Sequence, residues 1–166
     1  QVTTNDIFAN PNDNLFEISN DGNLLAVSFS DGSLSVFDVA NDDEIEVYGS
    51  TSDFTHFEGG FYKEYFAYSA SNTTKSVFAV IDVNKKEQIG GFNKDGYFEV
   101  QADETGIFTK IDNILVEIDP VSGEQMPLIN TSENIVDFAR SDSHTMASYK
   151  GGVLFFDEKA NLTSKI

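Results

Sequence analysis

One pattern recurs four times along the chain and constrains its fold more than any other feature. Each copy is a short apolar run that ends in an aspartate, followed by a polar turn. The four aspartates are Asp38, Asp82, Asp119 and Asp157, and successive ones lie 44, 37 and 38 residues apart. Self-similarity at a nearly constant period indicates a chain built from repeated supersecondary units.

Each repeat contains three more strand-like runs, two before the aspartate and one after it. Residues that tolerate positive φ separate the middle runs at Asp31-Gly32, Asp112-Asn113 and Gly151-Gly152. In the second repeat, a longer polar loop over 71–76 replaces the tight turn. The earliest runs of the four repeats are Leu15–Ser19, Phe54–Glu58, Tyr97–Gln101 and Ile135–Ala139. No useful helical periodicity is found, so the sequence predicts an all-β chain with four antiparallel strands per repeat.

Four antiparallel strands in a unit of about 40 residues are typical of a β-propeller blade. A single thin blade cannot cover both of its faces, so blades stack on one another. We therefore predict one domain over 1–166 with four four-stranded blades, as a complete array or as part of a larger propeller. The predicted blades are 14–52, 53–94, 95–131 and 132–166, with 1–13 as a leading strand or closure segment.

The ends of the repeats resemble a known superfamily. The segments 36–41, 80–85 and 117–124 look like blade ends of YVTN, quinoprotein-like and WD40-like propellers, and 19–28 resembles the turn and strand that begin such blades. The resemblance spans roughly residues 14–166 and implies the architecture alone. The chain has no Trp, and the Trp-Asp and Gly-His pairs of WD40 blades are absent.

The charge of the chain limits its partners. It has 28 acidic and 10 basic residues, for a formal net charge of -18. Binding to nucleic acid or to an anionic membrane surface depends on Lys and Arg, so we expect neither. No apolar stretch is long enough to enter a bilayer. With no Cys there is no disulfide and no thiolate metal site. The partner we expect is a protein or small ligand of unidentified kind.

Few residues suggest chemistry. Asp42, Asp43 and Glu44 could supply oxygen ligands to calcium, although a solvated turn is the simpler interpretation. No cofactor is otherwise implied. His56 and His144 occupy unlike positions in their repeats and do not form an expected metal pair. Tyr62 and Tyr65 belong to an aromatic-rich stretch and could contribute to a binding surface, with core packing as the alternative.

The repeated aspartates have a structural explanation. A carboxylate at the end of a strand can accept hydrogen bonds from the backbone N–H groups of the following turn. We therefore predict that Asp38, Asp82, Asp119 and Asp157 form Asx-type turns rather than a shared functional site.

No catalytic signature accompanies the repeats, so the sequence favours a non-catalytic binding or scaffold module that uses loops on one propeller face. The alternative is a propeller enzyme, a calcium-type hydrolase or lyase that uses acidic loop residues. An unclosed array would expose blade faces, from which we expect self-association. The chain starts at Gln1 and has three sequons, at Asn72, Asn130 and Asn161. We expect an extracellular or cell-surface location, with the cytoplasm as the alternative.

Overall fold

The computed structural model describes residues 15–29, 31–48, 54, 56–141 and 143–166, and in this part of the chain every regular element is a strand. The first sheet contains β1 (Phe16–Ile18), β2 (Leu24–Ser28), β3 (Leu34–Asp38) and β4 (Asp43–Tyr48). The second contains β5 (His56–Tyr62), β6 (Tyr65–Ser71), β7 (Lys75–Asp82) and β8 (Glu87–Asp95). The third contains β9 (Gln101–Asp103), β10 (Gly106–Ile111), β11 (Ile114–Ile118) and β12 (Gln125–Asn130). The fourth contains β13 (Ile135–Arg140), β14 (His144–Tyr149), β15 (Gly152–Asp157) and β16 (Leu162–Lys165).

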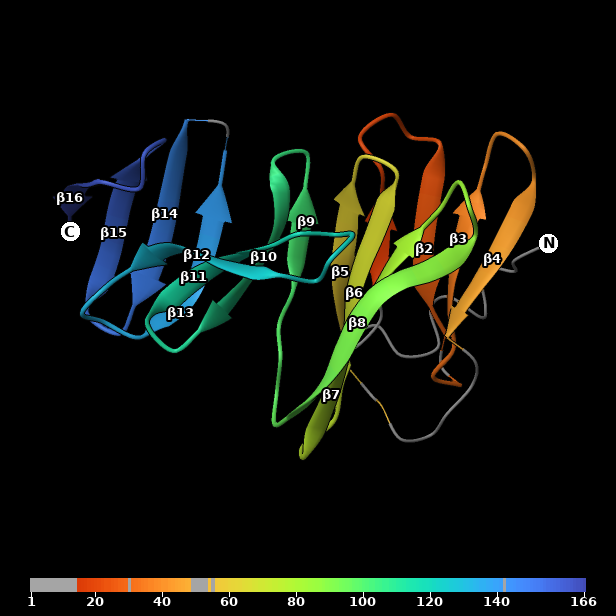
Figure 1. The fold of residues 1–166 in the computed structure, drawn as a ribbon, viewed down its shortest axis with the longest axis horizontal. Helices are drawn as coiled ribbons and strands as arrows, with labels where there is room; N and C mark the ends of the chain where they lie inside the picture. Colours follow the sequence, from red (N-terminus) through yellow and green to blue (C-terminus); the bar gives the residue numbers. More distant parts are fainter. Residues whose placement is uncertain (1–14, 30, 49–53, 55, 142) are drawn as a thin grey trace.

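Each sheet is an antiparallel meander whose strands pair in chain order. The four sheets stand one after another along the long axis of the molecule (Figure 1). The predicted fold class, an all-β array of four four-stranded blades, is confirmed. The predicted turns also have the expected backbone: Gly32 has φ 81°, and Asp112 has φ 54°.

Two local predictions were wrong. The segment 97–100 is not in a strand, because the third sheet begins at Gln101. Its apolar residues Phe98 and Val100 pack into the core between the second and third sheets instead. The predicted loop 71–76 is shorter than expected, because β6 continues as far as Ser71 and β7 already begins at Lys75. A turn of three residues joins them, and the Asn72 side chain accepts the N–H of Thr74 at 2.8 Å.

The hydrophobic core is divided into three parts, each lying between two neighbouring sheets. The buried residues between the first and second sheets include Leu15, Ala26, Leu34, Val36 and Ile45, which pack against Phe66, Tyr68 and Ala79. Those between the second and third are Ala67, Phe78 and Val80 against Phe98, Val100, Ile107 and Ile118. Those between the third and fourth are Phe108, Leu115 and Ile129 against Ile135, Phe138, Ala147, Leu154 and Phe156. Stacking of sheets therefore supplies the burial that one sheet cannot provide alone.

The second sheet shows why its strands are apolar at almost every position. Successive residues in a strand point to opposite faces. In β6, Phe66 and Tyr68 enter the core shared with the first sheet, and Ala67 enters the core shared with the third. In β7, Ala79 and Val80 divide in the same way. A strand covered on both sides needs apolar residues in both alternating sets.

Neighbouring sheets meet closely at their first strands. β1 contacts β5, and β5 contacts β9. Gly60 allows the second of these approaches, because a Cβ atom on Gly60 would overlap the backbone carbonyl of Ala102. The first-strand edges of these sheets thus lie side by side.

The four repeated aspartates form turns at the ends of the third strands. The Asp38 carboxylate accepts the N–H of Asn41 at 3.0 Å, and Asp82 accepts that of Lys85 at 3.0 Å. The Asp119 carboxylate accepts the N–H of Ser122 at 2.7 Å. The Asp157 carboxylate accepts those of Lys159 and Asn161 at 3.0 and 2.8 Å. Side-chain hydrogen bonds from Asn41, Lys85 and Asn161, and then these backbone hydrogen bonds, favour the ionised carboxylates and lower the pKa of Asp38, Asp82 and Asp157. At Asp119 the backbone N–H of Ser122 is the largest cause of the lowered pKa.

We predict that Gly60→Ala destabilises the domain, because the new methyl group must push β5 away from β9. Overpacking of this kind typically costs about 1–3 kcal/mol. Urea denaturation followed by circular dichroism would measure the free energy of unfolding. Gly90→Ala is the matched control, since its Cβ would lie 3.5 Å from the nearest atom, the Pro120 carbonyl oxygen. Equal stability of the two variants would contradict the close approach at Gly60.

We also predict that stability falls in acid because of the aspartate turns. The folded pKa of each aspartate lies below its unfolded value of about 3.9. The stabilisation is therefore complete above that value and is lost as the pH falls toward the folded pKa. Asp119→Ala and Asp157→Ala should lower the melting temperature at neutral pH and flatten its fall in acid. Glu158→Ala, next to Asp157 but exposed, should leave the profile unchanged.

Candidate functional site

A carboxylate occupies the same place at the first-strand edge of all four sheets. We call Glu17, Glu58, Glu99 and Asp137 the inner row. Successive members lie 41, 41 and 38 residues apart. Glu17, Glu58 and Asp137 belong to β1, β5 and β13, and Glu99 lies just before β9. Because the first-strand edges converge, the row brings these acidic side chains to one side of the array.

A cavity of about 480 Å³ lies along this edge in the first three sheets. It is lined by Leu15, Phe16, Glu17, Phe57, Glu58, Gly59, Glu99, Val100 and Gln101. We call it the inner groove. Its charged lining is entirely acidic, and loss of hydration raises the pKa of the Glu17 carboxyl.

Glu58 connects the second sheet to the segment that leads into the third. Its Oε1 accepts a hydrogen bond from the Tyr97 hydroxyl and lies 3.0 Å from Nε2 of His56. Its Oε2 is buried and has no hydrogen-bond partner among the described residues. The Tyr97 ring is half-exposed, but its hydroxyl is turned toward Glu58. Lost hydration, and then the hydrogen bond to Glu58, raise the pKa of Tyr97 well above its usual range.

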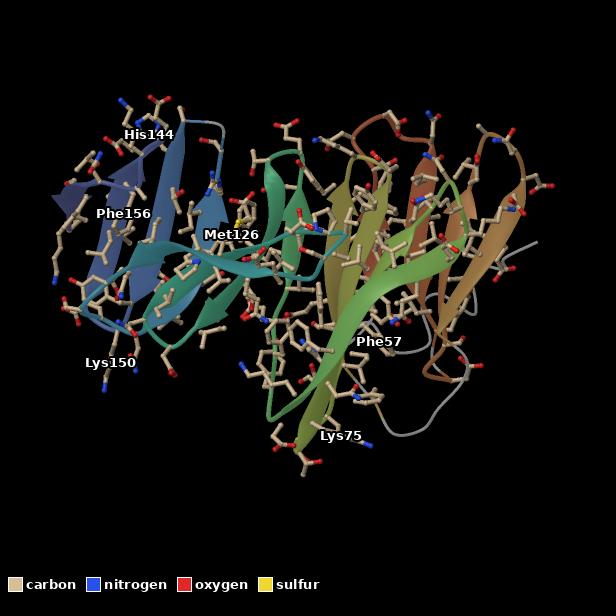
Figure 2. The ribbon with its side chains drawn as sticks, viewed as in Figure 1. Phe57, Lys75, Met126, His144, Lys150 and Phe156 are labelled. Atoms are coloured by element: carbon tan, nitrogen blue, oxygen red, sulfur yellow. The ribbon has the colours of Figure 1, made fainter. Side chains whose placement is uncertain are left out.

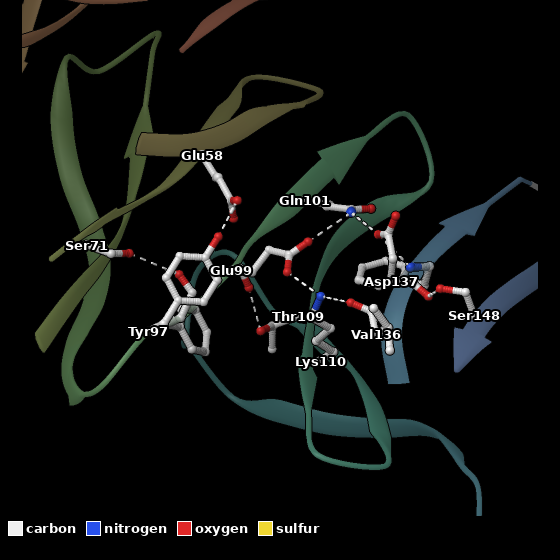
Figure 3. Close-up of polar contacts among 12 residues, drawn as sticks. Glu58, Ser71, Tyr97, Glu99, Gln101, Thr109, Lys110, Val136, Asp137 and Ser148 are labelled. Atoms are coloured by element: carbon white, nitrogen blue, oxygen red, sulfur yellow. Dashed lines mark hydrogen bonds and ion pairs between the residues drawn. The ribbon is translucent and has the colours of Figure 1, made fainter. Parts of the chain in front are cut away.

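Glu99 and Asp137 continue this network into the fourth sheet (Figure 3). The Lys110 ammonium forms an ion pair with Glu99, and both side chains are largely buried. Lys110 also donates to the Val136 carbonyl across the sheet boundary. The Gln101 amide lies 3.4 Å from Glu99 and 3.3 Å from Asp137, so it bridges the two carboxylates.

The inner row therefore contributes polar contacts at two junctions, between the second sheet and the segment that leads into the third, and between the third and fourth sheets. The groove presents oxygen acceptors, and its neighbouring basic groups, His56 and Lys110, already face Glu58 and Glu99. Chemically, the groove can accept hydrogen bonds from a donor or cationic group.

A second cavity, of about 550 Å³, opens among the turns of the first two sheets. It is lined by Asp21, Asn23, Leu24, Asp38, Asn41, Asp43, Ile45, Lys63, Glu64, Val83, Asn84 and Lys86. We call it the loop groove. The turns that follow the first and third strands of both sheets contribute to it, and these turns share one face of the array (Figure 1). An ion pair between Lys86 and Asp43 joins the two sheets across it.

The residues suggested for calcium lie at this groove. Asp42 and Glu44 are exposed, whereas Asp43 is half-buried and paired with Lys86. Within the described residues, no group of three His, Cys, Asp or Glu side chains is arranged to hold a metal ion. Calcium binding at Asp42, Asp43 and Glu44 stays a prediction.

Tyr62 and Tyr65 flank the turn between β5 and β6 and face each other across it. Both are half-buried and pack against the core between the second and third sheets. The Lys63 ammonium lies 4.6 Å from the centre of the Tyr62 ring. Their role in binding stays a prediction, but Lys63 and Glu64 of the same turn do line the loop groove. His144 is far along the array, exposed and bonded to Ser143.

The sequence-based predictions did not include the inner row. Glu17 and Asp137 lie in β1 and β13, which are edge strands of their sheets. The signal that would have found the row is the repeated carboxylate after an apolar residue, as in Phe16-Glu17, Phe57-Glu58 and Phe98-Glu99.

Solved structures with a similar fold include β-propeller and WD40 domains. The Myceliophteria thermophila Cps50 (Swd1) β-propeller domain matches with TM-score 0.63 and 10% identity, over 93% of this chain and 57% of that one. BamB from Moraxella catarrhalis matches with TM-score 0.61 and 12% identity, over 91% and 51%. The computationally designed Ika8 protein matches with TM-score 0.62 and 14% identity, over 87% and 46%.

These likenesses confirm the propeller-like architecture, and this chain spans about half the length of the neighbours named. No protein-family model matches the sequence. No curated protein matches it either. The described residues form no helix that is long and apolar enough to cross a bilayer.

We predict that Lys110→Met destabilises the domain by roughly 1–3 kcal/mol, because Glu99 would then be a largely buried carboxylate without its cation. Lys150→Met removes an exposed turn lysine and is the matched control. Urea denaturation at neutral pH would compare the two free energies of unfolding. A loss no larger than that of the control would contradict a structural role for the ion pair.

Proposed function

We propose that this domain is a non-catalytic binding module that recognises a protein segment at the loop face, through the loop groove. The supporting observation is the composition of that groove. Acidic side chains, two lysines and apolar side chains from the turns of two sheets surround a single cavity of about 550 Å³.

The loop groove suits a peptide better than a small ion. Leu24, Ile45 and Val83 offer apolar contact, while Lys63 and Lys86 are two of only ten basic residues in the chain. Mixed apolar and charged linings are typical of surfaces that fix both the position and the orientation of a partner. Loops held by a rigid sheet scaffold are also where binding residues usually lie.

The inner groove is the weaker candidate. Its charged lining is of one sign, and several of its polar groups already bond to the protein, including Glu58, Glu99 and Gln101. These contacts stabilise the junctions between sheets, so a structural role is enough to explain the polar residues of the inner groove.

Site-specific photocrosslinking would test the proposal. A benzophenone amino acid at Asn84, an exposed position in the loop groove, should crosslink a discrete partner in extracts of the source cells. The same group at Lys150 should not crosslink this partner. The turn before His144 follows the first strand of its sheet, as two of the loop-groove turns do, and Lys150 projects from the opposite side of the array to His144 (Figure 2). Mass spectrometry would identify the partner.

A charge reversal then tests whether the groove itself is responsible. Lys86→Glu should reduce crosslinking at Asn84 and weaken binding of the purified partner by tenfold or more, about 1.4 kcal/mol. Lys150→Glu makes the same change in charge away from the groove and should have no effect. Crosslinking of equal strength at Lys150, or binding insensitive to Lys86→Glu, would contradict the proposal.

A further inference from the structure

The two walls of the loop groove carry different charges. The first-sheet wall contributes three acidic residues, Asp21, Asp38 and Asp43, and no basic one. The second-sheet wall contributes both lysines of the groove, Lys63 and Lys86, and a single acid. This difference begins in the sequence, because residues 15–48 contain eight acidic residues and no basic one. The groove is therefore polarised from one sheet to the other.

Hydrogen bonds within the turns hold two of the first-wall carboxylates in place. Asp21 accepts the Ser19 hydroxyl at 2.7 Å and the Asn23 N–H at 3.0 Å. Asp38 accepts the N–H and the side-chain amide of Asn41 at 3.0 and 2.7 Å. These bonds lower the pKa of both acids, with the side-chain donors as the largest cause, so both are charged at neutral pH. Neither carboxylate forms an ion pair within the part of the chain that the structure describes.

The second-sheet wall keeps one lysine outside any ion pair. The Lys63 ammonium lies 4.6 Å from the centre of the Tyr62 ring, and no described carboxylate forms an ion pair with it. Lys86, by contrast, is paired with Asp43 of the first sheet. That pair cancels one charge on each wall. The charges that stay open to a partner are the other two carboxylates of the first wall, and Lys63 beside its neighbour Glu64.

Both lysines stand in a backbone conformation that lysine disfavours. Lys63 has φ 54° and Lys86 has φ 56°. Gly123, with φ 71°, holds the position in the third sheet that corresponds to Lys86, four residues after the repeated aspartate. Glycine adopts this region without steric cost, whereas a residue with a Cβ atom does not. The turns alone therefore do not explain the lysines, and contact with a partner does.

Apolar side chains complete the lining of the groove. Ile45 and Val83 are 8% and 7% exposed and belong to the core between the first and second sheets. Leu24 is half-buried and packs against the same core. The apolar part of the groove is thus the margin of a packed core, and it offers a firm seat for an apolar side chain. A cavity of about 550 Å³ has room for a few side chains of a partner.

We propose that the protein segment bound at the loop groove carries a basic, an apolar and an acidic residue in close succession. The basic residue meets Asp21 and Asp38, the apolar residue lies on Ile45 and Val83, and the acidic residue meets Lys63. This inference rests on the proposed function and adds the chemistry of the partner. The charges of the two walls fix the direction in which the segment lies.

Segments of a single charge fit the groove less well. A wholly basic segment would bring a cation to the lysines of the second wall. A wholly acidic one would bring a carboxylate to the acids of the first wall. Like charges that meet in this way count against a wrong partner, so the two walls together select for a segment of mixed charge.

Selection of random dodecapeptides displayed on phage tests the composition of the segment. Peptides enriched on the wild-type domain should share a Lys or Arg, an apolar residue and an Asp or Glu, always in the same order. A fluorescent peptide of the consensus sequence is then titrated against the domain by fluorescence anisotropy. Higher salt should weaken its binding, because salt screens contacts between exposed opposite charges.

Two variants remove the first-wall charges and keep the turns. Asp21→Asn and Asp38→Asn each retain an oxygen that can accept the turn N–H. Each should weaken binding of the consensus peptide by roughly twofold to fivefold, as expected for an exposed ion pair, and the double variant by roughly tenfold. Asp119→Asn makes the same change in the corresponding turn of the third sheet, outside the groove, and should leave binding unchanged.

Lys63→Gly separates binding from stability. It relieves the positive φ at this position, so the melting temperature followed by circular dichroism should stay equal or rise. Binding of the consensus peptide should still weaken by roughly twofold to fivefold. The loss should disappear for a peptide whose acidic residue is replaced by Gln, as the loss in Asp38→Asn should disappear when the basic residue is replaced. Losses that persist with these peptides would contradict the assigned contacts.

The outcomes distinguish this inference from the proposed function. Crosslinking at Asn84 detects a partner whatever the charge of its segment. A crosslinked partner together with enriched peptides that lack a basic residue would overturn this inference and leave the proposed function standing. Equal binding of the consensus peptide to wild type and to the double variant would do the same. Enrichment of no peptide would also overturn it, because a short segment would then be insufficient. Absence of both crosslinking and peptide binding would overturn the proposed function as well.

Discussion

The structure depends on burial between sheets rather than within them. A four-stranded meander has two faces and no interior, so an apolar residue on either face is covered only if another sheet lies against it. The second sheet shows the full consequence, because Tyr68 and Ala67 enter different cores from adjacent positions in one strand. Stability is therefore shared between neighbours, and no sheet in the array is an independent folding unit.

Polar contacts at the first-strand edge complement these apolar interfaces. Glu58 receives the Tyr97 hydroxyl from the segment leading to the third sheet, and Gln101 reaches Asp137 in the fourth. Such contacts are directional, whereas apolar packing tolerates small shifts of one sheet against another. We infer that the inner row sets the register between sheets. Lys110 beside Glu99 and Lys86 beside Asp43 also place cations at junctions in a chain of charge -18.

Much of the fold could be predicted from local sequence. The turn chemistry of Asp31-Gly32 and Asp112-Asn113 and the runs ending at Asp38 and Asp82 mark strands by short-range rules. The segment 97–100 was predicted as a strand because its apolar residues alternate with polar ones. That alternation shows only that one side of a segment is buried, and a segment outside any strand that packs on a neighbouring sheet has the same pattern. The grooves could not be predicted, because they join residues such as Asp43 and Lys86 whose proximity depends on how two sheets are placed.

The close approach at Gly60 has a consequence for how such a chain can change over time. A Cβ atom on Gly60 would overlap the Ala102 carbonyl, and the positions that correspond to Gly60 in the third and fourth sheets are Gln101 and Ala139. Each junction therefore has its own fit, although the sheets share one strand order. A sheet duplicated within the gene would need new side chains at its new neighbour before the two could pack as closely.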